Sequence, residues 1–376
     1  MRAPHHVLIA LVLAACSSEP SVTRAQLGAL VFADPGLSNP PGQACADCHA
    51  ARVAFRDPES SRATSMGAVA GRFGVRGAPS AMYASHVPPL HRDPHDGRWI
   101  GGLFWDGRAQ SLEDQAAGPL LNPLEMNNPD KASVVAAVRR AAYAGAFREL
   151  FGPGALDDVD AGFARITAVI AAYERTRTFA PFSSKYDRYL AGELVLDEAE
   201  RRGLAIFEDP ARGNCASCHP SRPGPDGTPP MFTDFGYANL GIPKYMNNKF
   251  YEQPAAFNPD GARYIDHGLM ATVGDRAQDG KFRVPTLRNV AVTAPYGHNG
   301  YFENLPYLLD FLSSRDVGSR DVGTCSRATP DALCAWPGPE VPATVDRRVG
   351  HLGLSAQDID DLAAFLSTLT DEVPAS

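Results

Sequence analysis

An excess of positive charge is missing from this chain of 376 residues, which carries 35 lysine and arginine residues against 43 aspartate and glutamate residues. Proteins that bind nucleic acids need a basic surface that neutralises phosphates, so we expect no nucleic-acid partner. The composition of a disordered protein is missing too, because 44% of the residues are hydrophobic and 21% are charged. The chain is too long for one ordinary core and fits two domains.

Long hydrophobic runs are absent except near the N-terminus, where Arg2 precedes the apolar run 7–13. This run is too short for a permanent membrane-spanning helix, and the small residues Leu13-Ala14-Ala15-Cys16 follow it. The pattern is typical of an export signal, and its ending resembles a bacterial lipoprotein signal. We expect residues 1–16 to be a lipoprotein-type signal peptide ending at Cys16. The alternative is an ordinary cleaved signal that happens to end near a cysteine.

An export signal places the folded protein in the periplasm or cell envelope. A lipid on Cys16 is then the expected membrane attachment, because no other run approaches spanning length.

Cysteine is scarce, with seven residues in the chain. Four of them lie in two matching motifs, Cys45-Ala-Asp-Cys48-His49 and Cys215-Ala-Ser-Cys218-His219. Apart from Cys16 of the signal, Cys325 and Cys334 are the two cysteines left. In an oxidising compartment we expect Cys325 and Cys334 to form a disulfide that closes a short loop. This assignment leaves no free thiol.

Cys-x-x-Cys-His is the attachment signature of c-type haem, in which two thiols bind the porphyrin and the histidine ligates the iron. The four thiols pooled in one zinc site are an alternative, and a thioredoxin-like pair would need a βαβ context that the neighbouring sequence does not show. Two motifs in one exported chain favour two covalent haem c groups. The predicted haem-binding residues are Cys45, Cys48 and His49 for haem 1, and Cys215, Cys218 and His219 for haem 2.

A repeat accompanies the two motifs. Gly28-Ala-Leu-Val-Phe-Ala-Asp-Pro35 precedes the first and Gly203-Leu-Ala-Ile-Phe-Glu-Asp-Pro210 the second, and each predicts an amphipathic helix ended by Asp-Pro. Each half also closes with helical apolar spacing, over 163–173 and over 359–369. The sequence therefore predicts a mainly α protein with two cytochrome c-like haem domains related by an internal repeat.

The predicted domains are residues 22–180 and 190–372, with a linker at 178–184 and a second-domain entry helix from near Leu196 to Phe207. A capping box of Ser355 and Asp358 is expected to open the last helix.

Two longer blocks are more specific than the haem motifs. Residues 101–126 contain Phe104-Trp105-Asp106-Gly107-Arg108, and residues 282–300 contain Pro285-Thr-Leu-Arg-Asn289 and Tyr296-Gly-His-Asn-Gly300. In these blocks the chain resembles the bacterial dihaem cytochrome c peroxidase and MauG family, over nearly all of residues 25–370. The resemblance implies that the N-terminal domain holds the peroxidatic haem and that the C-terminal domain holds an electron-transfer haem.

Trp105, Gln115 and Glu125 are spaced ten residues apart, and Gly118-Pro119 is expected to break the chain so that Glu125 returns beside the helix of Gln115. The resemblance implies an inter-haem tryptophan, a distal glutamine and a distal carboxylate. A carboxylate can move a proton between the oxygens of bound peroxide, which contributes about 10²–10⁴-fold. Taken singly, the three residues also fit a core aromatic, a helix surface and a solvated loop acid.

The chain departs from the family at both irons. Ala68 stands where many members carry a histidine on the peroxidatic iron, so we expect haem 1 to be five-coordinate, as in MauG-like members. The loop histidines His86, His91 and His95 are the competing source of a ligand there. Leu312 stands where the family places methionine or tyrosine, so the sixth ligand of haem 2 is absent or comes from elsewhere.

The family's calcium site is also incomplete. Thr293 and Pro295 match two carbonyl ligands of the calcium ion, but Gly77 replaces the asparagine. One calcium ion, with waters completing its coordination, is the resulting expectation.

Three functions compete. The first is a peroxidase that reduces hydrogen peroxide to water with electrons from a small exported cytochrome c or cupredoxin, passed through haem 2. The second is a MauG-like enzyme that uses high-valent iron to oxidise side chains of a partner protein. The third, a non-catalytic electron carrier, needs neither an open iron nor a distal acid, so Glu125 argues against it.

Overall fold

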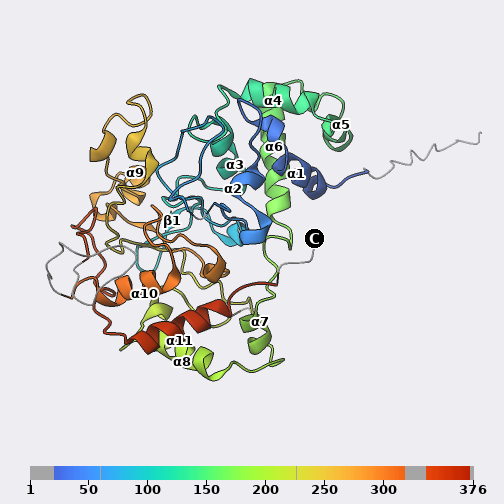
Figure 1. Ribbon diagram of the computed structural model, residues 1–376. Coiled ribbons are helices and arrows are strands. Elements are labelled where there is room, and N and C mark those ends of the chain that lie inside the picture. The colour runs from blue at the N-terminus through green and yellow to red at the C-terminus, as the bar shows by residue number, and fades with distance from the viewer. Residues whose placement is uncertain (1–20, 60, 226, 318–335, 373–376) are drawn as a thin grey trace, which may run out of the picture.

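The computed structural model describes residues 21–59, 61–225, 227–317 and 336–372. The signal at 1–16 and the predicted Cys325–Cys334 disulfide lie outside these residues. The described chain is mainly helical (Figure 1), as predicted. Its α-helices are α1 (Arg24–Phe32), α2 (Cys45–Cys48), α3 (Leu112–Leu121), α4 (Lys131–Arg140), α5 (Ala144–Phe151), α6 (Val159–Glu174), α7 (Lys185–Leu190), α8 (Glu198–Glu208), α9 (Leu269–Val273), α10 (Leu305–Ser314) and α11 (Ala356–Ser367).

Strands are short. β1 (His91–Arg92) pairs with β2 (Trp99–Ile100), and β3 (Tyr237–Ala238) pairs with β4 (Phe282–Arg283), both antiparallel. Neither pair of strands buries a hydrophobic face of its own, so the hydrophobic cores are formed by residues of the helices and long loops.

Local sequence explains where the main helices begin. At α1, the Thr23 side chain accepts from the Gln26 backbone and Gln26 reciprocates; α11 has the same arrangement between Ser355 and Asp358. Such a capping box satisfies backbone N–H groups that lack partners in the first turn. The capping box predicted at 355–358 is therefore confirmed.

Two long helix pairs organise the halves of the chain. Helix α1 packs against α6 in the first half, and α8 packs against α11 in the second. A Cβ atom at Gly28 of α1 would lie 1.9 Å from the Val169 carbonyl oxygen, and one at Gly203 of α8 would lie 2.0 Å from that of Asp361. Both glycines therefore allow a backbone approach that no other residue permits.

Each half has its own hydrophobic core. The first gathers Leu27, Val31, Phe32, Phe147, Ile166 and Phe179. The second gathers Phe207, Phe232, Phe302, Phe311, Leu362 and Phe365. Both phenylalanines of the repeated segment thus lie in these cores.

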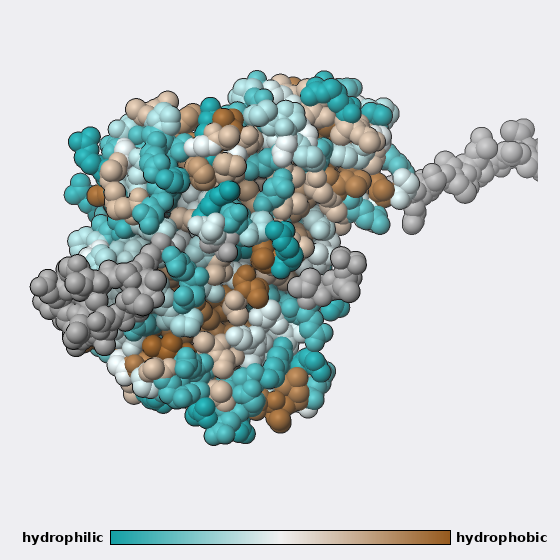
Figure 2. Space-filling model, in the orientation of Figure 1, coloured by the Kyte–Doolittle hydropathy of each residue, from teal (hydrophilic) through white to brown (hydrophobic). Residues whose placement is uncertain are grey.

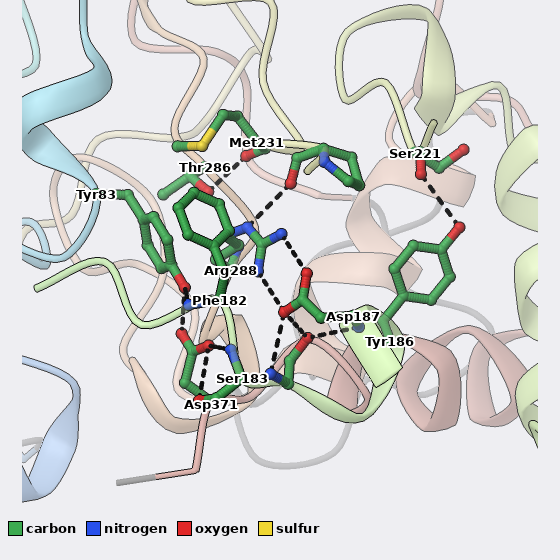
Figure 3. Close-up of polar contacts among 12 residues, drawn as sticks. Tyr83, Phe182, Ser183, Tyr186, Asp187, Ser221, Met231, Thr286, Arg288 and Asp371 are labelled. Carbon is green, nitrogen blue, oxygen red and sulfur yellow. Dashed lines mark hydrogen bonds and ion pairs between the residues drawn. The ribbon is translucent and has the colours of Figure 1, made fainter. Parts of the chain in front are cut away.

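The connection between the halves is packed rather than free. Phe179 and Ser184, both in or beside the predicted linker, are buried. The Ser183 N–H and the Tyr83 hydroxyl both donate to the carboxylate of Asp371, at 2.9 and 2.7 Å (Figure 3). The first half, the linker and the C-terminal end therefore share one buried polar cluster.

A salt bridge strengthens the same region. Arg288 binds both carboxylate oxygens of Asp187 at 2.8 and 2.9 Å, and its side chain is almost fully buried (Figure 3). A bidentate guanidinium–carboxylate pair fixes both distance and orientation, so α7 is anchored to the loop that carries Arg288.

The second half also reaches over the first. The gold segment around α9 lies beside the first half in Figure 1. There Gln253 donates to the Gly71 carbonyl at 2.9 Å, Asn248 to that of Val75 at 2.7 Å, and Arg76 binds Asp266.

Figure 2 shows hydrophilic residues over much of the visible face and hydrophobic residues gathered across its middle.

We expect Gly203→Ala to destabilise the haem-loaded protein by about 1–3 kcal/mol or more, the usual cost of overpacking. The added methyl group would collide with the α11 backbone and force the two helices apart. The midpoint and slope of urea unfolding measure this. Gly145→Ala is the control, because its Cβ would meet only the Arg148 side chain at 4.0 Å. An equally small effect at both positions would contradict the packing argument.

Candidate functional site

The first motif forms a short helix and presents a neutral histidine. His49 follows α2, and its Nδ1 donates to the Phe55 carbonyl oxygen at 2.9 Å. This bond leaves Nε2 as the ligating nitrogen, the usual arrangement of a metal-bound imidazole. Burial lowers the pKa of His49, which favours the neutral form that binds iron.

The second motif repeats these features in a single 3₁₀ turn, Cys215–Ser217. His219 Nδ1 donates to the Phe232 carbonyl oxygen at 2.7 Å, and burial lowers its pKa. Cys215, Cys218 and His219 line a large cavity. Leucine is the most frequent residue of the cavity wall, at Leu240, Leu287, Leu305, Leu308, Leu309, Leu312, Leu352, Leu354, Leu362 and Leu366.

These donors fit a c-type haem at each motif. Cys45, Cys48, Cys215 and Cys218 form no disulfide, and burial raises the pKa of the first three to about 12. Zinc binds thiolates rather than thiols, and no group of three His, Cys, Asp or Glu side chains within the described ranges could hold a metal ion. The pooled zinc site is therefore not supported, whereas at the second motif the apolar cavity beside unpaired thiols suits a porphyrin.

The helix that carries Gln115 differs from the prediction. Helix α3 continues through Gly118 and Pro119 and ends at Leu121, so the expected break between Gln115 and Glu125 is wrong. Proline removes one intrahelical bond, and this loss is tolerated in the last turn. The chain turns at Asn122 instead, where the Glu125 N–H donates to the Asn122 carbonyl at 3.0 Å.

Glu125 is returned beside the first motif. Its Oε1 accepts from Asn122 Nδ2 at 2.8 Å, and its carbonyl accepts from the Ala68 N–H at 2.8 Å. Burial raises the pKa of Glu125, against the opposing effects of the Arg108 charge and the Asn122 bond. The charge of Glu125 in turn helps to raise the pKa of the Cys48 thiol, so the carboxylate and the first motif lie near each other.

Ala68, at the position where the resemblance expects a ligand of the first iron, has no donor side chain. The loop histidines lie on the surface: His86, His91 and His95 are all exposed. His86 packs against Phe182 at 5.4 Å between ring centroids, and His91 Nδ1 bonds to the Pro89 carbonyl. Their exposure and contacts favour an uncapped site.

Trp105 lies where the two halves meet. Its Nε1 donates to the Gly77 carbonyl oxygen at 2.9 Å, and its own carbonyl accepts from the Arg283 N–H at 2.8 Å. The side chain lines the same cavity as Cys215, Cys218 and His219. The structure thus brings Trp105 to the second motif and Glu125 to the first, while Gln115 lies half-buried on α3.

One residue of this cavity was missed by the sequence analysis. His298 is buried, stacks on Phe282 with ring centroids 3.6 Å apart, and has no hydrogen-bond partner for either ring nitrogen within the described structure. Burial lowers its pKa to about 4, so the ring is neutral. The block 282–300 contains His298, but no role was predicted for this residue from the sequence.

The expected calcium ligands are differently engaged. The Pro295 carbonyl accepts from Arg56 Nη2 at 2.9 Å, and the Ala294 carbonyl accepts from Arg56 Nη1 at 2.6 Å. A guanidinium group therefore bonds one of the two carbonyls predicted to hold calcium, and Gly77 offers no side-chain oxygen. The residues present do not fit a calcium ion here.

Comparison with known proteins decides the family. A family model described as di-haem cytochrome c peroxidase matches residues 22–194. The chain is 41% identical over 355 residues to the methylamine utilization protein MauG of Paracoccus denitrificans, which covers 92% of this chain and 88% of that protein. The chain belongs to the di-haem cytochrome c peroxidase family.

Other relatives agree with this assignment. The cytochrome c551 peroxidase of Nitrosomonas europaea is 31% identical over 277 residues, covering 73% of this chain and 68% of that one. The crystal structure of the diheme peroxidase BthA from Burkholderia thailandensis matches with a TM-score of 0.75 at 34% identity, covering 94% of this chain and 87% of that chain. A MauG-like protein associated with microbial copper homeostasis matches with a TM-score of 0.68 at 30% identity, over 94% and 90% of the two chains.

Membership of a di-haem peroxidase family makes the protein an oxidoreductase and implies two haem groups. Across the parts of the chain that the structure describes, no helix is both long and apolar enough to cross a membrane.

We expect the untreated ferric, haem-loaded protein to show a substantial axial high-spin signal in low-temperature EPR, because Ala68 supplies no ligand. Peroxide should then react without prior reduction. Ala68→His, which adds an imidazole at this position, should convert that signal to low spin. A wild-type spectrum with low-spin haems alone, together with no optical change on adding peroxide, would contradict the open site.

Proposed function

We propose that this protein reduces hydrogen peroxide to water at the first haem, with electrons from a small exported cytochrome c or cupredoxin that enter through the second haem. The observation that carries the proposal is the position of Glu125. A desolvated carboxylate, held by Asn122 and bonded through its backbone to Ala68, lies beside a site without an internal ligand. An electron carrier has no use for this arrangement.

The proposal includes two cytochrome c-like domains, residues 22–180 and 190–372, related by an internal repeat. Three parallels support it: a glycine in each long helix pair, a buried phenylalanine after that glycine, and a proximal histidine whose Nδ1 bonds a phenylalanine carbonyl. The haem groups, when attached through the paired cysteines, supply the iron that reacts with peroxide and the redox centre that accepts donor electrons.

In this proposal Glu125 transfers a proton between the two oxygens of peroxide. Its carboxylate accepts the proton from the inner oxygen of peroxide and delivers it to the outer oxygen, which leaves as water. Asn122 keeps Oε1 oriented, and the raised pKa makes the carboxylate a stronger base than an ordinary glutamate, which favours taking up the proton. Gln115 donates a hydrogen bond to an oxygen of the substrate but cannot carry a proton.

Trp105 carries electrons between the halves. Its indole N–H donates to an amide carbonyl, that of Gly77. A carbonyl has almost no basicity, so the indole keeps its proton when it loses an electron. Electron transfer through Trp105 therefore needs no proton acceptor at this position.

A MauG-like oxidation of a partner protein's side chains is the second candidate. The 41% identity to the Paracoccus denitrificans MauG and the absence of a donor at Ala68 favour it. Leu312, which lines the cavity of the second motif, separates this chain from members that carry an oxygen or sulfur ligand there. Peroxidase chemistry is the first candidate because it needs only a small electron donor and the groups already present.

Export to the periplasm or cell envelope, with a lipid on Cys16, completes the proposal and is consistent with covalent haem attachment. The test of function is steady-state oxidation of reduced c-type cytochrome by peroxide. Two cytochromes oxidised per peroxide consumed would support a peroxidase. A protein that reacts with peroxide yet oxidises neither a cytochrome nor a cupredoxin would contradict it and favour the second candidate.

We expect Glu125→Gln to retain both haems and to lower the rate of the peroxide reaction by about 10²-fold or more, the lower end of acid–base contributions. In the wild type, the rate should fall as the pH falls through the pKa of Glu125, which burial raises above 4.5, because only the carboxylate accepts a proton. The variant should lack this step in its pH profile.

Stopped-flow absorbance measures these rates. Glu113→Gln is the matched control on α3, since Glu113 forms a surface ion pair with Arg175 and should leave the rate unchanged. A Glu125→Gln rate within about threefold of wild type would remove Glu125 from the mechanism.

Trp105→Phe should leave the reaction of peroxide at the first haem intact but slow the oxidation of the second haem, because phenylalanine is much harder to oxidise. Stopped-flow spectra of the reduced second haem after mixing with peroxide measure this step. Trp99→Phe, in β2, is the matched control and should have no effect. Unchanged inter-haem transfer in Trp105→Phe would place the electron route elsewhere.

A further inference from the structure

A buried arginine joins the two halves directly behind the first proximal histidine. Arg56 follows Phe55, whose carbonyl accepts the His49 Nδ1 bond, and only 6% of Arg56 is exposed. Its guanidinium crosses to the second half and donates to the carbonyls of Ala294 and Pro295. A weaker contact joins it to the Asp57 carbonyl at 3.4 Å.

The Arg56 guanidinium lies between Gly77 and Pro295, two of the positions matched to the family's calcium ligands. Nη2 bonds the Pro295 carbonyl, and a Cβ atom at Gly77 would lie 3.7 Å from Nη2 and 3.9 Å from the His298 carbonyl oxygen. Carbonyl oxygens that converge in a buried place require a cation or N–H donors. Here one side chain supplies both the positive charge and the donors.

We propose that the Arg56 guanidinium is a built-in cation that takes the place of calcium at the junction, so that the two halves assemble without a metal ion. The planar fork of arginine holds carbonyls in fixed directions and cannot lose its charge in a protein. Calcium needs six to eight oxygen ligands. It would also meet the repulsion of this buried positive charge.

The junction matters because the inter-haem tryptophan depends on it. The Gly77 carbonyl accepts from Trp105 Nε1, and the Gly77 N–H donates to the His298 carbonyl, both at 2.9 Å. Arg56 bonds the backbone three to four residues before His298. Arg56 is therefore a positioning residue. It fixes the segment 294–298, which holds Gly77 through the His298 carbonyl, and Gly77 in turn holds the Trp105 indole.

Calcium titration of the haem-loaded protein tests the proposal. After dialysis against a chelator, the wild type should take up no calcium at the junction in calorimetry, and added calcium should leave its unfolding temperature within about 1 °C. Arg56→Ala should lower that temperature by about 4 °C or more, because two charge-assisted bonds across the junction are lost.

The decisive variant exchanges one cation for the other. Arg56→Ser combined with Gly77→Asn removes the guanidinium and restores a side-chain oxygen, so calcium should bind one to one and raise the unfolding temperature by several degrees. Gly77→Asn alone is the matched control: it keeps the guanidinium and should bind no calcium. If Arg56 only supported the fold and did not stand in for calcium, its replacement in the double variant would not create a calcium site.

Two results would overturn the proposal. One is a wild-type protein whose unfolding temperature falls by several degrees in chelator and recovers with calcium. The other is a double variant that folds with both haems yet neither binds calcium nor gains stability from it. If the double variant does not fold, the wild-type titration and Arg56→Ala still decide.

Discussion

The backbone of Gly77 is the point on which the arrangement of the two halves depends. Its carbonyl accepts the Trp105 indole N–H, and its N–H donates to the His298 carbonyl. One peptide segment thus fixes an aromatic side chain of the first half and a loop of the second half in the same place. A displacement there would move Trp105 relative to the cavity of the second haem motif, so in the proposed mechanism these backbone bonds set the path for electrons.

Buried charges on both sides make this segment rigid. Arg76, next to Gly77, binds Asp106 and Asp266, each at 2.7 Å. Despite its burial, Asp266 has its pKa lowered to about 2 by the Arg76 charge and hydrogen bonds, so this ion pair persists at any pH at which the protein works. Removing one partner of a buried pair leaves an uncompensated charge and costs about 3–5 kcal/mol. The inter-haem region is therefore held by fixed charges.

The sequence predicted the features that depend on neighbours along the chain and missed those that depend on distant contacts. The helices closing each half and the capping box at Ser355 follow from local periodicity and hydrogen bonding. Gly118-Pro119 was wrongly expected to break α3, because a proline in the last turn removes only one bond, and packing of α3 against α6 compensates. The contacts of Arg56 were not predicted because its acceptors lie 238 and 239 residues away along the chain, and no local sequence pattern indicates such a contact.

The central claim is that peroxide reacts in the first half while the second half supplies an electron through the junction. The most direct measurement starts from protein with both haems reduced and mixes it with one equivalent of peroxide in a stopped-flow spectrometer. Reduction of one peroxide to water takes two electrons and two protons. The account predicts that both haems are reoxidised together, one electron from each. Rapid reoxidation of one haem, with the other still reduced long afterwards, would contradict it.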